Sequence, residues 1–547
     1  MRARRRQAWR TWSGAGFLIL AVLLVRVAGC TSRKASPTTT PRFNIHPHYA
    51  ALSRADLVIE SQRKAVMGRR ESLADVRRVV ETVRPVVAEA VRQPEVEAGL
   101  RALAAATHLP EEELRARLQS LQEADLLLES GGDPNAVSPA GAVGVAQWMA
   151  DTARRAGLRV DVAEYQHVVA RGRALRAEIE AAYAQAPEWQ ASVAPGTPPV
   201  KRDEWIRQKL DVLRQLEKRR LQADERYDPR KAIFAQTRHL VRLWQRFGRI
   251  DWALQAYHGG VRGAERTIAL YLGCPISAAS PARVSFEEVY FGVSPRRHPR
   301  AFSYLYGRAD DHRYYWWRIL AAERALKLFR TDPARFEAWW EALAPGYPLD
   351  RAWYPDALSQ PYADVEALRS AAARGELLPI PDNAARFGFA PRSVAPLDAA
   401  NERHYRVLRA EALGMVRRVA ELYRREGGRE PLRVTGAAAT VAYAARLAAA
   451  AAGVSPSQQP QDANPSGSST QSAGEAPAPA PSGELALTLH AAGWCADIAR
   501  PQARHDQHVL EYALGQLSDR MRLAWLRDRQ ANAYHLCPNP AFAEEMR

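Results

Sequence analysis

The sequence predicts a mainly α-helical protein of several domains, with one small α+β domain at its C-terminal end. Apolar side chains recur every three to four residues through 73–91, which is the period of an amphipathic helix. Short strand-like runs occur at 431–435 and 485–489. The 547 residues exceed what one ordinary hydrophobic core accommodates, so two or three domains are expected.

The first 29 residues have the pattern of an export signal. Arginines precede the apolar run 17–25, which is too short to span a bilayer comfortably. The run is followed by Val-Ala-Gly-Cys at 27–30, which resembles the lipobox of bacterial lipoproteins. The resemblance implies a signal peptide at 1–29, acylation of Cys30 and a lipid-anchored tether at 30–49. The residue after the cysteine is Thr31 and not Asp. For a lipoprotein, the resemblance then implies a location in the periplasm, at the outer membrane. The alternative is an uncleaved anchor helix.

The net charge is strongly positive. The formal value is +17, and removing residues 1–29, which carry six arginines and no acidic residue, leaves +11. A basic body suits a polyanionic partner such as a cell-wall polymer, an anionic lipid or a nucleic acid. Since the sequence has no compact basic helix with interleaved aromatics and no nucleic-acid motif, a nucleic-acid partner is not expected.

Residues 50–107 have helical periodicity without residues that suggest chemistry, so a packing or stalk role is expected. Residues 170–222 are highly charged and are broken by prolines near their middle. They are predicted to form a helical hairpin inserted into a domain that extends over 108–284.

Residues 285–429 are helical in pattern and rich in aromatic side chains, including the pairs Trp316-Trp317 and Trp339-Trp340. Such pairs could stack on sugar rings in a glycan groove, but tryptophans at helical spacing more often belong to a core. The last domain is predicted to span 430–547, with a disordered insertion at 454–484 that is rich in Ser, Pro, Gln, Ala and Gly.

The most specific motif is ESGGDPNAVSPAGAVGVAQWM at 129–149, followed by DERYDP at 224–229 and AYHGG at 256–260. Together these motifs resemble the signatures of the soluble lytic murein transglycosylases, over residues 108–275. The family is related to goose-type lysozyme, so the resemblance implies a lysozyme-like helical domain that acts on peptidoglycan glycan strands. The sequence departs from the family where His258 replaces the usual Asn and Gly259 the usual Ala.

Glu129 is the expected acid and base. Cleavage of a glycosidic bond needs a carboxylic acid that holds its proton beside the leaving oxygen, and Leu126–Leu128 would partly desolvate this one. The resemblance implies that Ser138 and Gln147 touch the sugar, that the Tyr257 hydroxyl reaches the active site, and that no cofactor is needed. It further implies cleavage of the MurNAc–GlcNAc bond with formation of 1,6-anhydro-MurNAc. The alternatives are a non-catalytic wall-binding scaffold and a zinc peptidase acting on stem peptides.

The peptidase alternative rests on HAAGWCADI at 490–498 and YHLC at 534–537. These segments resemble the zinc carboxypeptidases that cut D-Ala-D-Ala stems, which implies a zinc ion held by His490, Asp497 and His535. The catalytic Glu of that family would fall at Asn532, and its substrate-loop Arg is absent from 436–439, so a degenerate domain is predicted. Isolated histidines on strands are the simpler alternative.

Three cysteines remain besides Cys30: Cys274, Cys495 and Cys537. In strands, the period of two puts Cys495 on the face of Asp497 and Cys537 on the face of His535. The two sulfurs could form a disulfide or offer thiolates to a metal, and export favours the disulfide.

Overall fold

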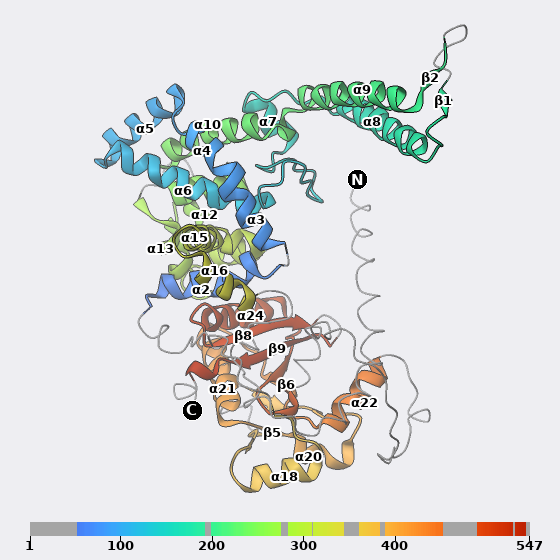
Figure 1. Cartoon of the computed structure of the whole chain (residues 1–547). Helices are drawn as coiled ribbons and strands as arrows, with labels where there is room; N and C mark the ends of the chain where they lie inside the picture. The colour runs from blue at the N-terminus through green and yellow to red at the C-terminus, as the bar shows by residue number, and fades with distance from the viewer. Residues whose placement is uncertain are drawn as a thin grey trace. The chain divides into compact units, whose positions relative to one another are not determined.

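The computed structural model describes residues 52–69, 71–191, 198–274, 283–308, 310–343, 360–382, 389–451, 490–528 and 531–542. The predicted signal peptide, Cys30, the tether and the 454–484 insertion lie outside these residues, as does the strand expected at 485–489. Within the described part of the chain, none of the helices combines the length and the apolar character that a membrane crossing needs. The predicted fold class is confirmed: the protein is mainly helical with a small α+β part (Figure 1).

The chain divides into two compact units. The helical unit comprises Arg69–Gly292 and Gly307–Phe336, and the mixed unit comprises Met1–Gly68, Val293–Tyr306 and Glu337–Arg547. These limits differ from the predicted segments, because 50–107 and 285–429 each contribute to both units. An amphipathic face packs wherever an apolar partner is available, and periodicity alone does not identify that partner.

The described helices of the helical unit are α3 (Ser72–Arg78), the π-helical turn η3 (Val79–Val83), α4 (Arg84–Ala90), α5 (Pro94–Thr107), α6 (Glu111–Ser130), α7 (Ala150–Arg155), α8 (Val162–Tyr183), α9 (Arg202–Ala223), the 3₁₀ turn η4 (Glu225–Tyr227), α10 (Pro229–Phe247), α11 (Ile250–Gly259), α12 (Val261–Leu272), α13 (Phe286–Gly292) and α15 (Asp310–Thr331).

Helix α6 is central to the unit and packs against α15 and α5. It begins after Pro110, with three glutamates in its first turn that complement the helix dipole. It ends at Gly131, whose φ of 63° lies in the left-handed region that a glycine adopts without strain. Because this glycine ends the helix, Glu129 lies in the last turn, at the edge of the packed core.

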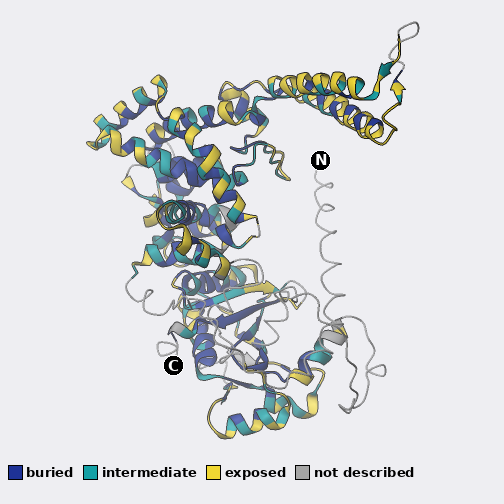
Figure 2. Ribbon diagram, in the orientation of Figure 1, coloured by how far each residue is buried: buried dark blue, intermediate teal, exposed yellow. Residues whose placement is uncertain are grey.

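The inserted hairpin consists of α8 and α9, which lie side by side in Figure 1 and are joined through the short antiparallel pair β1 (Gln190–Ala191) and β2 (Val200–Lys201). Its helices extend over 162–223, somewhat beyond the predicted 170–222, because the Asp161 side chain caps α8 by accepting from the Glu164 amide at 3.0 Å. The hairpin has its own small apolar core, which includes Val168, Leu175 and Leu216. Its outward faces are exposed (Figure 2).

The tryptophan pairs belong mainly to the core. Trp317 on α15 is fully buried, and Trp316 and Trp339 are buried as well. The core interpretation of these aromatics is therefore confirmed for three of the four side chains.

The mixed unit contains a five-stranded sheet in the order β4-β6-β7-β9-β8. Its strands are β4 (Phe389–Pro391), β6 (Leu432–Gly436), β7 (Ala496–Ala499), β8 (Leu523–Asp528) and β9 (Ala533–Pro538). Strand β4 is parallel to β6, and the remaining pairs are antiparallel, with Asp497 opposite His535.

The other described elements of the mixed unit are α2 (Arg54–Met67), α14 (Pro299–Tyr306), α18 (Val365–Ala373), η7 (Ala399–Asn401), α20 (Glu402–Tyr405), α21 (Ala410–Arg425), α22 (Val441–Ala451), α24 (Arg504–Ser518), η9 (Pro540–Phe542) and the antiparallel pair β3 (Leu378–Pro379) and β5 (Val407–Leu408). Helix α16 (Pro333–Leu343) has residues in both units.

The purely helical prediction for 285–429 was wrong in its second half, since β3, β4 and β5 lie there and β4 belongs to the main sheet. These strands have two or three residues each, which is too short for an alternating pattern to be recognised.

Candidate active site

Glu129 lies in the last turn of α6 with 14% of its side chain exposed. Its Oε1 atom accepts a hydrogen bond from the Tyr315 hydroxyl at 2.6 Å and lies 3.4 Å from His258 Nδ1. Among the described residues, no hydrogen bond reaches Oε2. One oxygen is therefore held by the protein, and the other is left to act on a substrate.

A second carboxyl group lies one helical turn earlier, at Asp125, and is completely buried. Its Oδ1 atom is hydrogen-bonded to the Tyr315 hydroxyl, and its Oδ2 atom accepts from Gln236 Nε2 at 2.7 Å. Burial, together with the neighbouring charge of Glu129, raises the pKa of Asp125 to about 8. Both effects favour the neutral form of this carboxyl group.

Sequence reasoning missed both Asp125 and Tyr315. An acid within the apolar run before Glu129, at the i−4 position on the same helix, is a usable signal for Asp125. Tyr315 lies 186 residues from Glu129, and no local pattern marks it. Burial raises the pKa of the Tyr315 hydroxyl well above its ordinary value, so it remains a donor.

The glycine-containing loop after α6 is fixed to its surroundings by polar contacts. Ser130 Oγ donates to the Val145 carbonyl at 2.7 Å, and Gly144 lies so close to Arg226 that a Cβ would be 1.9 Å from its carbonyl oxygen. Arg226 is buried, pairs with Asp224 at 2.7 Å and donates to the Trp148 carbonyl at 3.1 Å. Asp224 and Arg226 of the motif at 224–229 thus stabilise the conformation of the loop within the motif at 129–149.

Ser138 and Gln147 both bind this loop's own backbone. Ser138 Oγ accepts from the Ala142 amide at 3.0 Å, and Gln147 Nε2 donates to the carbonyls of Gly144 and Ala136 at 2.9 and 3.2 Å. The backbone of Gln147 has a φ of 47°, which these bonds help to stabilise. Contact with the sugar remains a prediction for these two side chains.

Tyr257 on α11 donates its hydroxyl to the Ala146 carbonyl at 2.6 Å and packs edge-on against Trp148. Burial, together with the charges of Asp125 and Glu129, raises its pKa well above the ordinary value. Tyr257 therefore joins α11 to the loop beside the two carboxyl groups.

The two departures from the family pattern occur together. The His258 ring stacks on Tyr315 with 3.9 Å between ring centroids and an angle of 13° between their planes. At Gly259, a Cβ would lie 3.1 Å from His312 and 3.2 Å from Arg308, whose Nη2 donates to the Gly259 carbonyl at 2.9 Å. The smaller residue at 259 thus permits the close approach of Arg308 and of His312 on α15, beside the stacked histidine.

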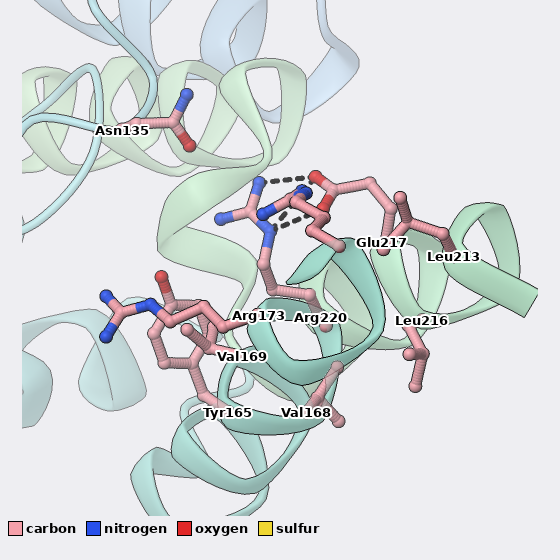
Figure 3. Close-up of a pocket in the computed structure, with 11 residues that line it drawn as sticks. Asn135, Tyr165, Val168, Val169, Arg173, Leu213, Leu216, Glu217 and Arg220 are labelled. Atoms are coloured by element: carbon pink, nitrogen blue, oxygen red, sulfur yellow. Dashed lines mark hydrogen bonds and ion pairs between the residues drawn. The ribbon is translucent and has the colours of Figure 1, made fainter. Parts of the chain in front are cut away.

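A pocket of about 340 Å³ is lined by Asn135 of the active-site loop and by side chains of α8 and α9 (Figure 3). Arg220, on its wall, pairs with Glu217 at 2.6 Å. Arg173 and Arg176 also line the pocket and have no ion pair with any acidic residue in the described part of the chain. Two such guanidinium groups would attract an anionic group.

The predicted ligands His490, Asp497 and His535 come together in the mixed unit. His490 Nε2 lies 3.2 Å from Asp497 Oδ1 and 3.1 Å from His535 Nδ1, and the last two atoms are 2.9 Å apart. Three ligands of a tetrahedral zinc ion are separated by roughly 3.3 Å, so the set fits this metal. The Ala437 carbonyl, 3.0 Å from His490 Nδ1, favours the tautomer with Nε2 free for a metal.

Cys495 and Cys537 form a disulfide beside this cluster, as favoured from the sequence, and Cys274 is a free thiol. The two sulfurs of the disulfide therefore offer no thiolate to a metal. Asp528, the nearest acid before His535, accepts from the Ala531 amide at 3.0 Å in the β8–β9 turn. Asn532 occupies the position where a peptidase would need its carboxylate, so the cluster provides ligands without a proton acceptor.

A helical domain with one accessible carboxyl at a helix end and a glycine-containing loop over it has the form of a lysozyme-like glycan-cleaving domain. Residues 126–170 match the family model described as the transglycosylase SLT domain. This segment contains Glu129, the whole loop and the start of α8. The chain thus carries a transglycosylase SLT domain, consistent with the lytic transglycosylases, whose substrate is the glycan strand of peptidoglycan. No curated protein and no solved structure matches the chain.

Proposed function

We propose that the protein is a lytic murein transglycosylase that cleaves the MurNAc–GlcNAc bond and leaves a 1,6-anhydro-MurNAc end. The observation that carries this proposal is the difference between the two carboxyl groups of the site. Glu129 is accessible through Oε2, whereas Asp125 is completely buried and engaged by Tyr315 and Gln236. Asp125 cannot reach a sugar as the nucleophile or second base that most glycosidases require. Among the described residues of the site, Glu129 is then the carboxyl group that performs both proton transfers.

In the proposed reaction, Glu129 Oε2 first gives its proton to the glycosidic oxygen as the bond from that oxygen to C1 of MurNAc breaks. Glu129 Oε2 then accepts the proton of the 6-hydroxyl of MurNAc as O6 of that sugar bonds to C1. The leaving GlcNAc keeps the first proton and Glu129 regains one, so no water is consumed. The loop over Glu129 and the arginines of the hairpin pocket would hold an anionic strand in place.

The test is digestion of purified peptidoglycan in H₂¹⁸O, with the products analysed by mass spectrometry. A transglycosylase yields anhydro ends without ¹⁸O, because the new bond comes from the sugar's own hydroxyl. Reducing ends that carry ¹⁸O would instead identify a hydrolase. Binding without any cleavage would favour the wall-binding scaffold.

For the mixed unit we propose zinc binding by His490, Asp497 and His535, without peptidase activity. When bound, zinc would supply a Lewis acid able to polarise a carbonyl group. The chain places no carboxylate beside these ligands other than Asp497 itself among the described residues, so proton abstraction from water would lack a base. In this proposal the metal site binds stem peptides or stabilises the fold of the mixed unit.

Metal content measured by mass spectrometry after dialysis against trace zinc tests this proposal. One equivalent is expected in the unaltered protein and none in His535→Ala, while His508→Ala, which changes a histidine of α24 outside the cluster, should retain it. Absence of zinc from all three proteins would contradict the proposal.

We further propose that the protein is a periplasmic lipoprotein anchored through Cys30, which rests on the lipobox-like residues 27–30. Membrane fractionation of cells producing the unaltered chain or Cys30→Ser tests the anchor. The unaltered chain should sediment with outer membranes, and the variant should not. Equal sedimentation of both would argue for an uncleaved anchor.

A further inference from the structure

The hydrogen bonds that link Asp125, Tyr315 and Glu129 require one of the two carboxyl groups to be protonated. The Tyr315 oxygen contacts a carboxyl oxygen on each side, Oδ1 of Asp125 and Oε1 of Glu129. A hydroxyl has one proton to donate. For both contacts to be hydrogen bonds, one of the two carboxyl groups must itself be protonated and donate to the Tyr315 oxygen.

The surroundings decide which carboxyl group holds this proton. Asp125 is fully buried, and its other oxygen already accepts from Gln236, whereas Glu129 is partly exposed. An ionised carboxylate is disfavoured most strongly at the more buried position. The titratable groups that face Asp125 are Glu129 of the same helix, His258 and Tyr257 of α11, and Tyr315 of α15. Of these, only His258 could carry a positive charge, and its Nδ1 atom lies 3.4 Å from Glu129 Oε1.

We propose that Asp125 is a positioning residue that keeps its proton throughout the reaction, donates it to the Tyr315 oxygen and thereby aims the Tyr315 hydroxyl at Glu129 Oε1. The inference rests on the proposed function, since it explains how Glu129 serves as both acid and base. With Oε1 always an acceptor, the exchangeable proton is confined to Oε2, the oxygen open to the sugar. When Glu129 has given up its proton, the Tyr315 donor stabilises the carboxylate until the 6-hydroxyl returns one.

Three variants of the full-length protein test the role. Asp125→Asn retains an N–H donor toward Tyr315 but cannot ionise, Asp125→Ala removes the donor, and Tyr315→Phe removes the bridge. We expect kcat to fall about threefold in Asp125→Asn, and about tenfold to a hundredfold in the other two variants, with KM changed less than twofold. Asp125→Ala combined with Tyr315→Phe should lose no more than Tyr315→Phe alone, because both act through one bond.

The pH profile separates this role from a merely structural one. Asp125→Asn replaces one neutral group with another, so activity should decline on the alkaline side at the same pH as in the unaltered protein, up to about pH 8. If Asp125 were ionised, its removal would take a negative charge from beside Glu129 and shift that decline to lower pH by about one unit. Such a shift, or an equal loss of kcat in Asp125→Asn and Asp125→Ala, would overturn the proposal. Asp151→Asn, at an exposed ion pair on α7, is the matched control.

An infrared measurement keeps the proposal testable apart from activity. At pH 7 the unaltered protein should show a protonated-carboxyl band from Asp125, measured as the part of the carboxyl absorption that is missing from Asp125→Asn and retained in Asp151→Asn. A protein that shows the band but cleaves no glycan would contradict the proposed function while supporting the protonation of Asp125. Absence of the band would contradict this inference even if cleavage occurs.

Discussion

The Tyr315 hydroxyl donates to Glu129 at 2.6 Å and contacts the buried Asp125 with the same oxygen. Helices α15 and α6 are thus joined at the point where the site's two carboxyl groups lie one turn apart. This single contact connects the stability of the helical unit with the protonation of its active site.

The buried Asp125 should make stability depend on pH. Its pKa is about 8 in the folded protein and close to 4 in the unfolded chain, so the folded state binds the extra proton between these values. Its stabilising contribution is therefore complete below about pH 4 and is lost as the pH rises toward 8, by at most about 1.4 kcal/mol per pH unit. Asp125→Asn lacks this dependence.

We therefore expect the melting temperature of Asp125→Asn to rise relative to the unaltered protein as the pH is raised from 5 to 8. Calorimetric scans of the helical unit's transition at several pH values measure this difference, with Asp151→Asn as control. A difference that is constant with pH would mean that Asp125 is already ionised at pH 5.

Gly144 should tolerate no side chain. A Cβ there would lie 1.9 Å from the Arg226 carbonyl oxygen, and the φ of 78° adds strain for any other residue. We expect Gly144→Ala to destabilise the protein by about 3 kcal/mol or more. Gly141→Ala is the control, because φ is 87° there but no atom lies within 4 Å of the added Cβ. Its cost should be about 1 kcal/mol. Equal melting temperatures for the two variants would show that the contact with Arg226 is not close.

The hairpin pocket should influence substrate preference. Arg173 and Arg176 lack ion-pair partners among the described residues, and peptidoglycan stem peptides carry free carboxylates. Changing both arginines to Gln should raise KM severalfold on strands that carry stem peptides, and less on strands from which an amidase has removed them. Arg171→Gln on α8 with Lys218→Gln on α9 removes the same charge from the hairpin outside the pocket and should alter neither value. Equal increases of KM on strands with and without stem peptides would show that the arginines attract the strand by charge alone and do not bind the stem peptides.

The part of the site that is contiguous in sequence could be predicted. Glu129, its helix and the glycine loop form one motif whose local chemistry determines its shape, and residues 126–170 match the SLT model. The disulfide between Cys495 and Cys537 was one of two alternatives, favoured because export permits disulfides, and the structure confirms it.

The parts that depend on distant segments could not be predicted. Tyr315 comes to Glu129 only because α15 packs on α6, and nothing in residues 310–331 indicates that partner. The short strand β4 joins the sheet through pairing with β6, which periodicity cannot detect over three residues. Ser138 and Gln147 were expected at the sugar, but the hydrogen bonds that hold the loop depend on its folded shape.

The most direct test of Glu129 as the acid and base of the reaction is the effect of Glu129→Gln on peptidoglycan sacculi, with the soluble products identified by mass spectrometry. The variant keeps a hydrogen-bond acceptor for Tyr315 but has no proton to transfer as an acid or base. This role predicts anhydro-muropeptides from the unaltered protein and from Asp151→Asn, and none from Glu129→Gln, whose melting temperature should stay near that of the unaltered protein. Anhydro-muropeptides released by Glu129→Gln at an undiminished rate would contradict it.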